Sequence, residues 1–279
     1  ERTYNGLYVE NEYVKALVFP EIGGRLHGAV DKTNGYEFLY DQKVIKPGLI
    51  STTGAWISGG VEWNFPIGHR PSGFREVDWS ITEDDDTKTA WVGEIDRLTG
   101  MRWSVGTTVH PHRNWVETKV RLYNSTPYVQ RFQYWATSAV RATQNYQAVI
   151  PGELMTGHGE KEFYHWSVHD GVDISYWKNI PGAGSYFAVD SQSDFFGGYS
   201  PEENAGIVHF ADHHIVRGKK LWTWGTAPAG RLWEKILTDG DLPYFEPQAG
   251  AYSDNQPSLF WIMPGETKIF SHFWFPVRD

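Results

Sequence analysis

The chain has 279 residues, 40% of them hydrophobic and 21% charged, a balance that excludes general disorder and suits one large folded domain. Its 25 Lys and Arg against 34 Asp and Glu give a formal net charge of −9, which argues against a protein that holds nucleic acid by neutralising phosphates. The sequence contains no cysteine, so disulfides, thiolate nucleophiles and cysteine-ligated zinc are excluded.

Alternation of apolar and polar residues with a period of two dominates the chain, which predicts β-strands. In chain order the predicted strands cover residues 13–19, 88–95, 101–109, 115–123, 130–139, 185–189, 205–211, 258–263 and 268–275. The strands at 101–109 and 115–123 are joined by a short turn-rich segment, so they should form a hairpin. The best helix candidate is short, at residues 231–237. We predict an all-β fold with long loops and few short helices, in a single domain over residues 1–279.

Residues 54–74, GAWISGGVEWNFPIGHRPSGF, form the first candidate site segment. They combine paired glycines, the carboxylate of Glu62, Trp63, an X-Pro turn and the adjacent His69 and Arg70. Such a density of polar and aromatic groups is typical of binding loops. A kinked edge strand with a surface salt bridge between Glu62 and Arg70 is the structural alternative.

Residues 243–256, PYFEPQAGAYSDNQ, form the second candidate segment. Glu246 lies between Phe245 and Pro247, and a carboxylate with apolar neighbours is a candidate for a raised pKa and for acid–base work. Asp254 and Gln256 follow as candidate binding groups. A salt-bridged structural glutamate is the alternative.

The third segment, residues 211–225, collects polar and aromatic side chains, among them His213, His214, Lys220, Trp222 and Trp224. Adjacent histidines on a strand point to opposite faces, so at most one of the two is expected in a single site. A hydrogen-bonded structural histidine is the alternative. Because metal-binding, phosphate-loop, dinucleotide and serine-hydrolase motifs are absent from the sequence, we expect no metal and no cofactor.

These segments also carry a resemblance that runs through nearly the whole chain. In order, the stretches that carry it are AVDKTNGYEFLY, VIKPGLI, GAWISGGVEWNFPIGHRP, RLYNSTP, NIPGAGSYF, FADHHIVRGKKLWTWG and PYFEPQAGAYSDNQP. They resemble the bacterial family catalogued as domain of unknown function 5107, often found ahead of tetratricopeptide repeats. The family is similar in turn to the galactose mutarotase-like superfamily. That likeness implies a β-supersandwich of two large antiparallel sheets whose concave face binds sugar.

In mutarotases a glutamate removes the proton from the anomeric hydroxyl and a histidine protonates the ring oxygen. FEPQAG is similar to the C-terminal glutamate segment of aldose epimerases, so the resemblance implies Glu246 as the base. The histidine pattern differs: Ser72 stands at the His-Gly-Phe position, His69 lies shortly before it, and Tyr134 and Trp135 begin the segment that replaces a mid-chain histidine motif.

The leading hypothesis is a carbohydrate-active enzyme that acts at the anomeric centre, as a glycoside hydrolase or transferase. Its acid–base pair would be Glu62 and Glu246, facing each other across a groove, with His69 and His214 completing the catalytic set. The predicted substrate-binding residues are Arg25, Trp56, Trp63, Asn64, Arg70, Trp135, His213, Lys220, Trp222, Trp224, Asp254 and Gln256.

Two alternatives remain open. An aldose 1-epimerase, or mutarotase, would use Glu246 as base and a histidine, His69 or His214, as acid. A non-catalytic carbohydrate-binding domain would hold a glycan with the same side chains. In each case the expected partner is a mono- or oligosaccharide, with no nucleic acid and no membrane, and a tetratricopeptide-repeat region in a longer parent chain is implied by the resemblance. No membrane span is visible, so a soluble protein of the bacterial cytoplasm or periplasm is expected.

Overall fold

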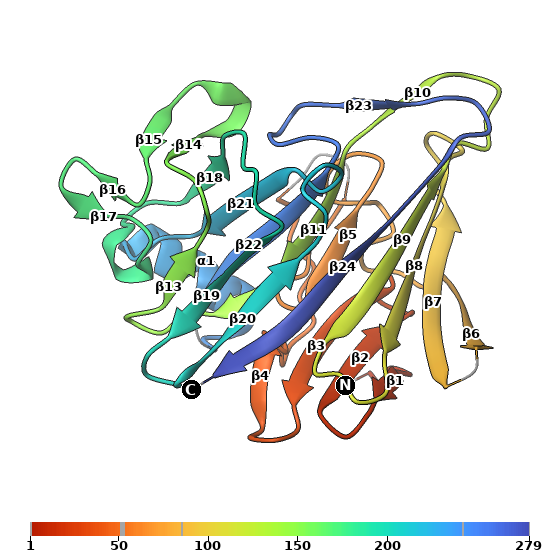
Figure 1. The fold of residues 1–279 in the computed structure, drawn as a ribbon, viewed down its shortest axis with the longest axis horizontal. Coiled ribbons are helices and arrows are strands. Elements are labelled where there is room, and N and C mark those ends of the chain that lie inside the picture. The colour runs from red at the N-terminus through yellow and green to blue at the C-terminus, as the bar shows by residue number, and fades with distance from the viewer. Residues whose placement is uncertain (1, 51–53, 85, 242, 279) are drawn as a thin grey trace.

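The computed structural model describes residues 2–50, 54–84, 86–241 and 243–278, and two large antiparallel sheets make up most of it (Figure 1). The first sheet has twelve strands. Along its main path they are β1 (Leu7–Glu10), β2 (Val14–Phe19), β3 (Arg25–Asp31), β5 (Val61–Asn64), β11 (Tyr134–Ser138), β22 (Tyr244–Ala251), β21 (Gly218–Thr223), β18 (Gly184–Ala188), β14 (Leu154–Thr156) and β15 (Phe163–His165). Beside this path, β4 (Tyr36–Leu39) pairs with β3 and β12 (Val140–Arg141) with β22.

The second sheet has eight strands and lies in front of the first in Figure 1. In order they are β13 (Gln147–Val149), β19 (Phe195–Ser200), β20 (Ala205–Phe210), β24 (Thr267–Arg278), β9 (Val116–Tyr123), β8 (Arg102–Val109), β7 (Thr87–Ile95) and β6 (Asp78–Asp84). Two small ribbons pair β10 (Gln130–Phe132) with β23 (Phe260–Ile262) and β16 (Val168–His169) with β17 (Val172–Asp173). The helical elements are α1 (Pro228–Thr238) and the 3-10 turns η1 (His158–Glu160) and η2 (Trp177–Asn179).

The hydrophobic core fills the space between the sheets, and alternation along the strands decides which side chains reach it. On β5, Val61 and Trp63 belong to the core, as do Phe245 and Ala249 on β22. The residues between them therefore lie on the opposite face of the twelve-stranded sheet, turned away from the second sheet. Glu62 and Glu246 share that outer face.

The structure confirms the main sequence predictions for the fold. The predicted hairpin is the pair β8–β9, with Val109 opposite Val116. The predicted helix exists as α1, which begins earlier than expected with a proline in its first turn and ends before Asp239 in the left-handed conformation. Among the described residues, no helix is long and apolar enough to cross a membrane.

One predicted strand, residues 130–139, is divided between two sheets. Its first half, β10, pairs with β23 in a small ribbon, while its second half, β11, enters the twelve-stranded sheet between β5 and β22. Between the halves, the backbone N–H of Gln133 donates to the carbonyl of Pro66 at 2.6 Å. The alternation continues through the break, so the local pattern did not reveal it.

Candidate functional site

A cavity of 460 Å³ lies on the outer face of the twelve-stranded sheet. Its apolar wall includes Trp56 and Trp222. Its polar lining consists of Asn64, His69, Gln133, Thr137, His158, Lys220, Glu246, Gln248 and Gln256. The cavity therefore brings together residues from all three segments that the sequence predicted. It also contains residues that the sequence did not predict.

Strand register builds the floor of this cavity. Thr137 on β11 pairs with Glu62 on one side and with Gln248 on the other, and Gln248 pairs with Lys220 on β21. Glu246 stands two positions before Gln248 on β22, so the two side chains share one face of the strand. Glu62, Thr137, Gln248 and Lys220 thus form one row across four neighbouring strands, and Glu246 lies beside this row, next to Gln248. All of these except Glu62 line the cavity.

Glu246 is buried, with only 4% of its surface exposed. Its Oε2 accepts a hydrogen bond from Gln248 Nε2 at 2.9 Å, whereas its Oε1 has no partner among the described residues. Burial raises the pKa of Glu246, although Lys220 and His69 attract its ionised form. Burial likewise lowers the pKa of Lys220 against the attraction of Glu246. A carboxyl group with a raised pKa at a cavity wall suits proton transfer near neutral pH.

His69 and Glu62 form an ion pair behind the cavity wall. The imidazole Nδ1 lies 2.7 Å from Glu62 Oε2, and Glu62 is only 3% exposed. Burial opposes the charge on both groups, but their mutual attraction and hydrogen bond outweigh it. The pKa of Glu62 is therefore lowered and the pKa of His69 is raised. His69 lines the cavity, while Glu62 is not part of its lining.

The two predicted arginines hold loops in place. Arg25 donates to the backbone carbonyls of Ile57 and Gly59. Arg70 donates from Nε to the Trp63 carbonyl and from Nη1 to Glu94 Oε1, at 2.7 and 2.9 Å. Both guanidinium groups are buried and neither belongs to the cavity lining, although Arg25 Nε has no partner among the described residues. These contacts fit a positioning role better than the predicted binding of substrate.

The predicted tryptophans divide into two groups. Trp56 and Trp222 line the cavity. Trp63 faces the core between the sheets and donates its indole N–H to the carbonyl of Gly24, so its predicted place in the groove is wrong: it alternates with Glu62 along one strand. Trp135 is fully buried against Gly250, and Trp224 lies beside Trp56 and donates to the hydroxyl of Tyr244. The last two support the site from outside its lining.

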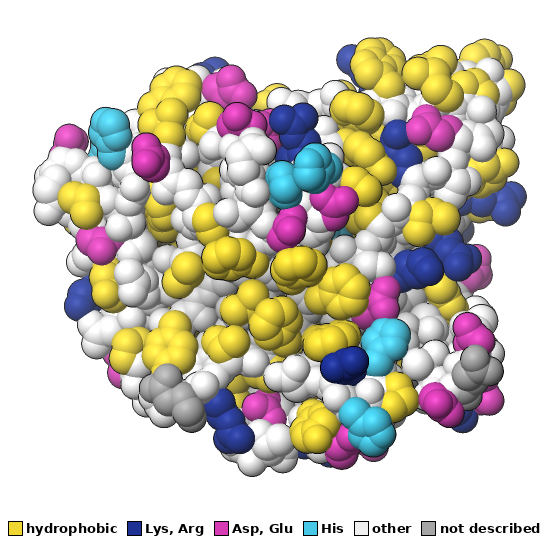
Figure 2. All heavy atoms as spheres, in the orientation of Figure 1, with side chains coloured by type: hydrophobic (Ala, Val, Ile, Leu, Met, Phe, Trp, Pro, Cys, Tyr) yellow, Lys and Arg dark blue, Asp and Glu magenta, His cyan; other side chains and the backbone are white. Residues whose placement is uncertain are grey.

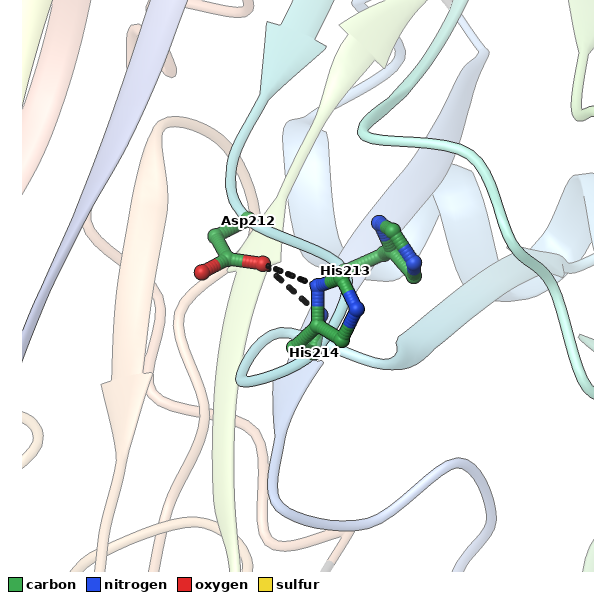
Figure 3. A group of neighbouring side chains, drawn as sticks. All are labelled: Asp212, His213 and His214. Atoms are coloured by element: carbon green, nitrogen blue, oxygen red, sulfur yellow. Dashed lines mark hydrogen bonds and ion pairs between the residues drawn. The ribbon is translucent and has the colours of Figure 1, made fainter.

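His213, His214 and Asp254 lie elsewhere, around a separate cavity of 230 Å³. The two histidines occupy a turn after β20 and not a strand, so the expectation of opposite faces is wrong; their ring centroids are 4.0 Å apart. His214 Nδ1 bonds Asp212 (Figure 3). His213 Nδ1 bonds Asp194. His214, predicted to be catalytic, is thus outside the Glu246 cavity.

Asp212, His213 and His214 form the one group of candidate metal ligands found among the described residues, with ligand atoms within 4.8 Å of one another. Each imidazole Nδ1 is already engaged by a carboxylate, and the side chains of Asp212 and His214 are largely exposed. Proximity alone does not assign an ion to them.

A larger cavity, of 920 Å³, lies on the eight-stranded sheet. It is lined mainly by apolar rings, including Phe210 and Phe273, and Figure 2 shows hydrophobic side chains gathered across this side of the molecule. Two of its polar groups are engaged within the protein: Asp31 accepts from Thr33, and His112 bonds a surface glutamate. It therefore offers no acid–base pair comparable to that of the smaller cavity.

Sequence reasoning missed His158, Thr137, Gln133 and Gln248. Gln248 carried a usable signal, because it lies two positions after Glu246 on a strand and must share its face. His158 carried none: it stands in the turn η1, far along the chain from the three segments. Burial and Lys220 lower the pKa of His158, so this ring is neutral at pH 7.

The fold is all-β and of the galactose mutarotase-like type. The chain matches the model of the family described as "Domain of unknown function (DUF5107)" over residues 1–277, and it belongs to that family. The structure is similar to that of a TPR-domain containing protein from Parabacteroides distasonis, with 28% identity and a TM-score of 0.91 over 99% of this chain. This chain spans 47% of the length of that protein.

Two further solved structures share the fold at low sequence identity. A galactose mutarotase-like protein from Lactobacillus casei matches with a TM-score of 0.66 and 12% identity, over 98% of this chain and 100% of the other. A galactose mutarotase related enzyme from Lactobacillus acidophilus matches with a TM-score of 0.64 and 9% identity, over 98% of this chain and 97% of the other. At these identities the likeness establishes the fold and not the activity.

Proposed function

We propose that the protein is a sugar 1-epimerase that opens and recloses the ring of an aldose, with Glu246 as base and His69 as acid. One observation carries the proposal: a single cavity is lined by a buried glutamate with an unpaired oxygen and by a histidine whose Nδ1 is held by a second carboxylate. The fold shared with mutarotase-like proteins agrees with a sugar ligand.

Both groups have shifted pKa values, which bear on this chemistry. The pair with Glu62 raises the pKa of His69, so more of the ring is protonated at neutral pH than in a free histidine. Burial raises the pKa of Glu246 to about 8, so its ionised form is a stronger base than an exposed carboxylate but is the minor form at pH 7. Asn64 and the Trp222 ring both line the cavity and can hold a sugar hydroxyl and a sugar face respectively.

In the proposed reaction Glu246 takes the proton from the anomeric hydroxyl, and the electrons of that O–H bond form the carbonyl. The bond from the anomeric carbon to the ring oxygen breaks, and the ring oxygen keeps its electron pair and takes a proton from His69. After rotation about the adjacent carbon–carbon bond, the new hydroxyl returns its proton to His69 and attacks the other carbonyl face. Glu246 then gives its proton back, so the enzyme is regenerated.

The position of Glu62 favours this reaction over glycoside hydrolysis. A hydrolase needs two carboxyl groups that both reach the glycosidic bond or the attacking water. Here Glu62 is buried, bonds His69 and is absent from the cavity lining, whereas Glu246 is part of it. Glu62 is better suited to orient and charge the histidine.

Polarimetry on freshly dissolved aldoses tests the proposal, with a panel that includes α-D-glucose and α-D-galactose. We expect wild type to accelerate mutarotation and Glu246→Gln to lose at least about a hundredfold of that acceleration, the scale of general acid–base catalysis. Glu234→Gln is a matched control, because Glu234 is also buried with a raised pKa but lies on α1 outside the cavity.

Aryl glycosides and oligosaccharides are assayed in parallel. Cleavage that disappears in Glu246→Gln would replace the epimerase by a hydrolase. Sugar binding without any turnover, equal in wild type and Glu246→Gln, would instead favour the non-catalytic carbohydrate-binding domain.

A further inference from the structure

A further cavity, of 400 Å³, adjoins the Glu246 cavity on the same sheet and is called the second cavity below. The two share His158, whose side chain lines both. Strand register links them a second time, because Glu246 pairs with Trp222 and Trp222 pairs with Ser185, which lines the second cavity. These three side chains lie side by side on one face of neighbouring strands.

The wall between the cavities is fixed to the rim of the first one. His158 belongs to η1, and the backbone N–H of Gly159 donates to Asn255 Oδ1 at 2.8 Å and to the Gln256 carbonyl at 2.9 Å. Asn255 Nδ2 donates in return to the Gly157 carbonyl at 3.0 Å. Because Gln256 lines the first cavity, the two compartments keep a set position relative to each other.

The second cavity offers the groups that a sugar ring needs. Ser185 is 7% exposed, and its hydroxyl is buried without a partner in the described part of the chain. The rings of Tyr164 and Tyr186 meet at 5.0 Å in its lining, and the charged side chains of Lys161 and Glu162 complete it. Tyr186 follows Ser185 on β18 and points to the other face of the sheet, so the aromatic ring on the same face as the Ser185 hydroxyl is that of its strand neighbour Trp222. A buried hydroxyl next to an indole ring is satisfied by a ligand that carries hydroxyls on an apolar ring.

We propose that the second cavity is a subsite for a second sugar unit, so that the protein prefers a reducing disaccharide to a free monosaccharide. The reducing unit occupies the Glu246 cavity and the next unit extends past His158 to Ser185. Trp222, between Glu246 and Ser185, lies under the junction of the two units. Which unit reacts rests on the function proposed above, whereas the existence of the subsite does not.

Binding tests the subsite independently of turnover. Dissociation constants are measured by tryptophan fluorescence and calorimetry for lactose, maltose and cellobiose and for their component monosaccharides, galactose and glucose. We expect at least one disaccharide to bind about tenfold more tightly than both monosaccharides. Ser185→Ala should weaken that disaccharide about fivefold, the effect of one hydrogen bond, and leave monosaccharide binding unchanged.

Ser191→Ala is the matched control, because Ser191 is also a buried serine but lies outside both cavities. Removing an unpaired buried hydroxyl should not unfold Ser185→Ala, which circular dichroism verifies. The subsite is overturned if no disaccharide binds more tightly than its monosaccharides, or if Ser185→Ala weakens both kinds of sugar equally. A disaccharide preference that persists while Glu246→Gln retains full mutarotation would refute the proposed function and keep the subsite.

Discussion

Replacing Glu62 with glutamine should lower the pKa of His69 and remove the acid from the site. Glu62 Oε2 lies 2.7 Å from His69 Nδ1, and its charge is the main influence that opposes burial and raises the pKa of that ring. Two unit charges about 4 Å apart attract by about 4 kcal/mol at an effective dielectric constant of about 20. Glutamine keeps a hydrogen-bond acceptor but not the charge, so only part of this attraction is lost.

We expect the pKa of His69 to fall by about one to two units in Glu62→Gln. This equals about 1.4–2.7 kcal/mol, which is less than the full attraction between the two charges. Since burial alone lowers the pKa of His69, the ring should then be neutral at pH 7. The mutarotation rate at pH 7 should fall by about 10- to 100-fold, because proton donation to the ring oxygen is lost. The falling limb of the pH–rate profile should move to lower pH, since His69 must be protonated to act.

NMR titration of the histidine ring protons measures the pKa directly, and polarimetry gives the pH–rate profile. Glu117→Gln is a matched control, because Glu117 contacts His110 at the same distance of 2.7 Å but far from the cavity. It should leave both the profile and the pKa of His69 unchanged. An unchanged pKa of His69 in Glu62→Gln, or full activity with a lowered pKa, would refute the reasoning.

Lys220→Met should move the rising limb of the pH–rate profile to higher pH by about one unit, because Lys220 stabilises the ionised form of Glu246; a limb that stays in place or moves to lower pH would contradict this. Gly60→Ala should destabilise the fold by more than about 1 kcal/mol in urea denaturation, since Gly60 has φ of +56° and an added Cβ would meet the Leu26 carbonyl oxygen at 2.3 Å. Gly171→Ala, at a positive φ of +79° with open space around it, should cost less; an equal loss would assign the effect to backbone strain alone.

Several parts of the site followed from local sequence. Glu246 and Lys220 were identified because each stands in a short segment dense in polar and aromatic groups, and both line the cavity. The assignment of Trp63 and Glu62 to one groove failed, although alternation already separates adjacent residues on a strand. The prediction that His213 and His214 point to opposite faces of a strand was wrong, because both residues lie in the turn after β20.

The sequence by itself determined the strand content and the residue types available for acid–base chemistry. These depend on local alternation and composition, which each segment carries independently of the rest. Only the tertiary structure decided that β11 lies between β5 and β22. It also decided that Glu62 bonds His69, whereas the sequence had predicted that Glu62 would face Glu246 across a groove. Such neighbours arise from packing two sheets together across long stretches of chain, and no local pattern encodes them.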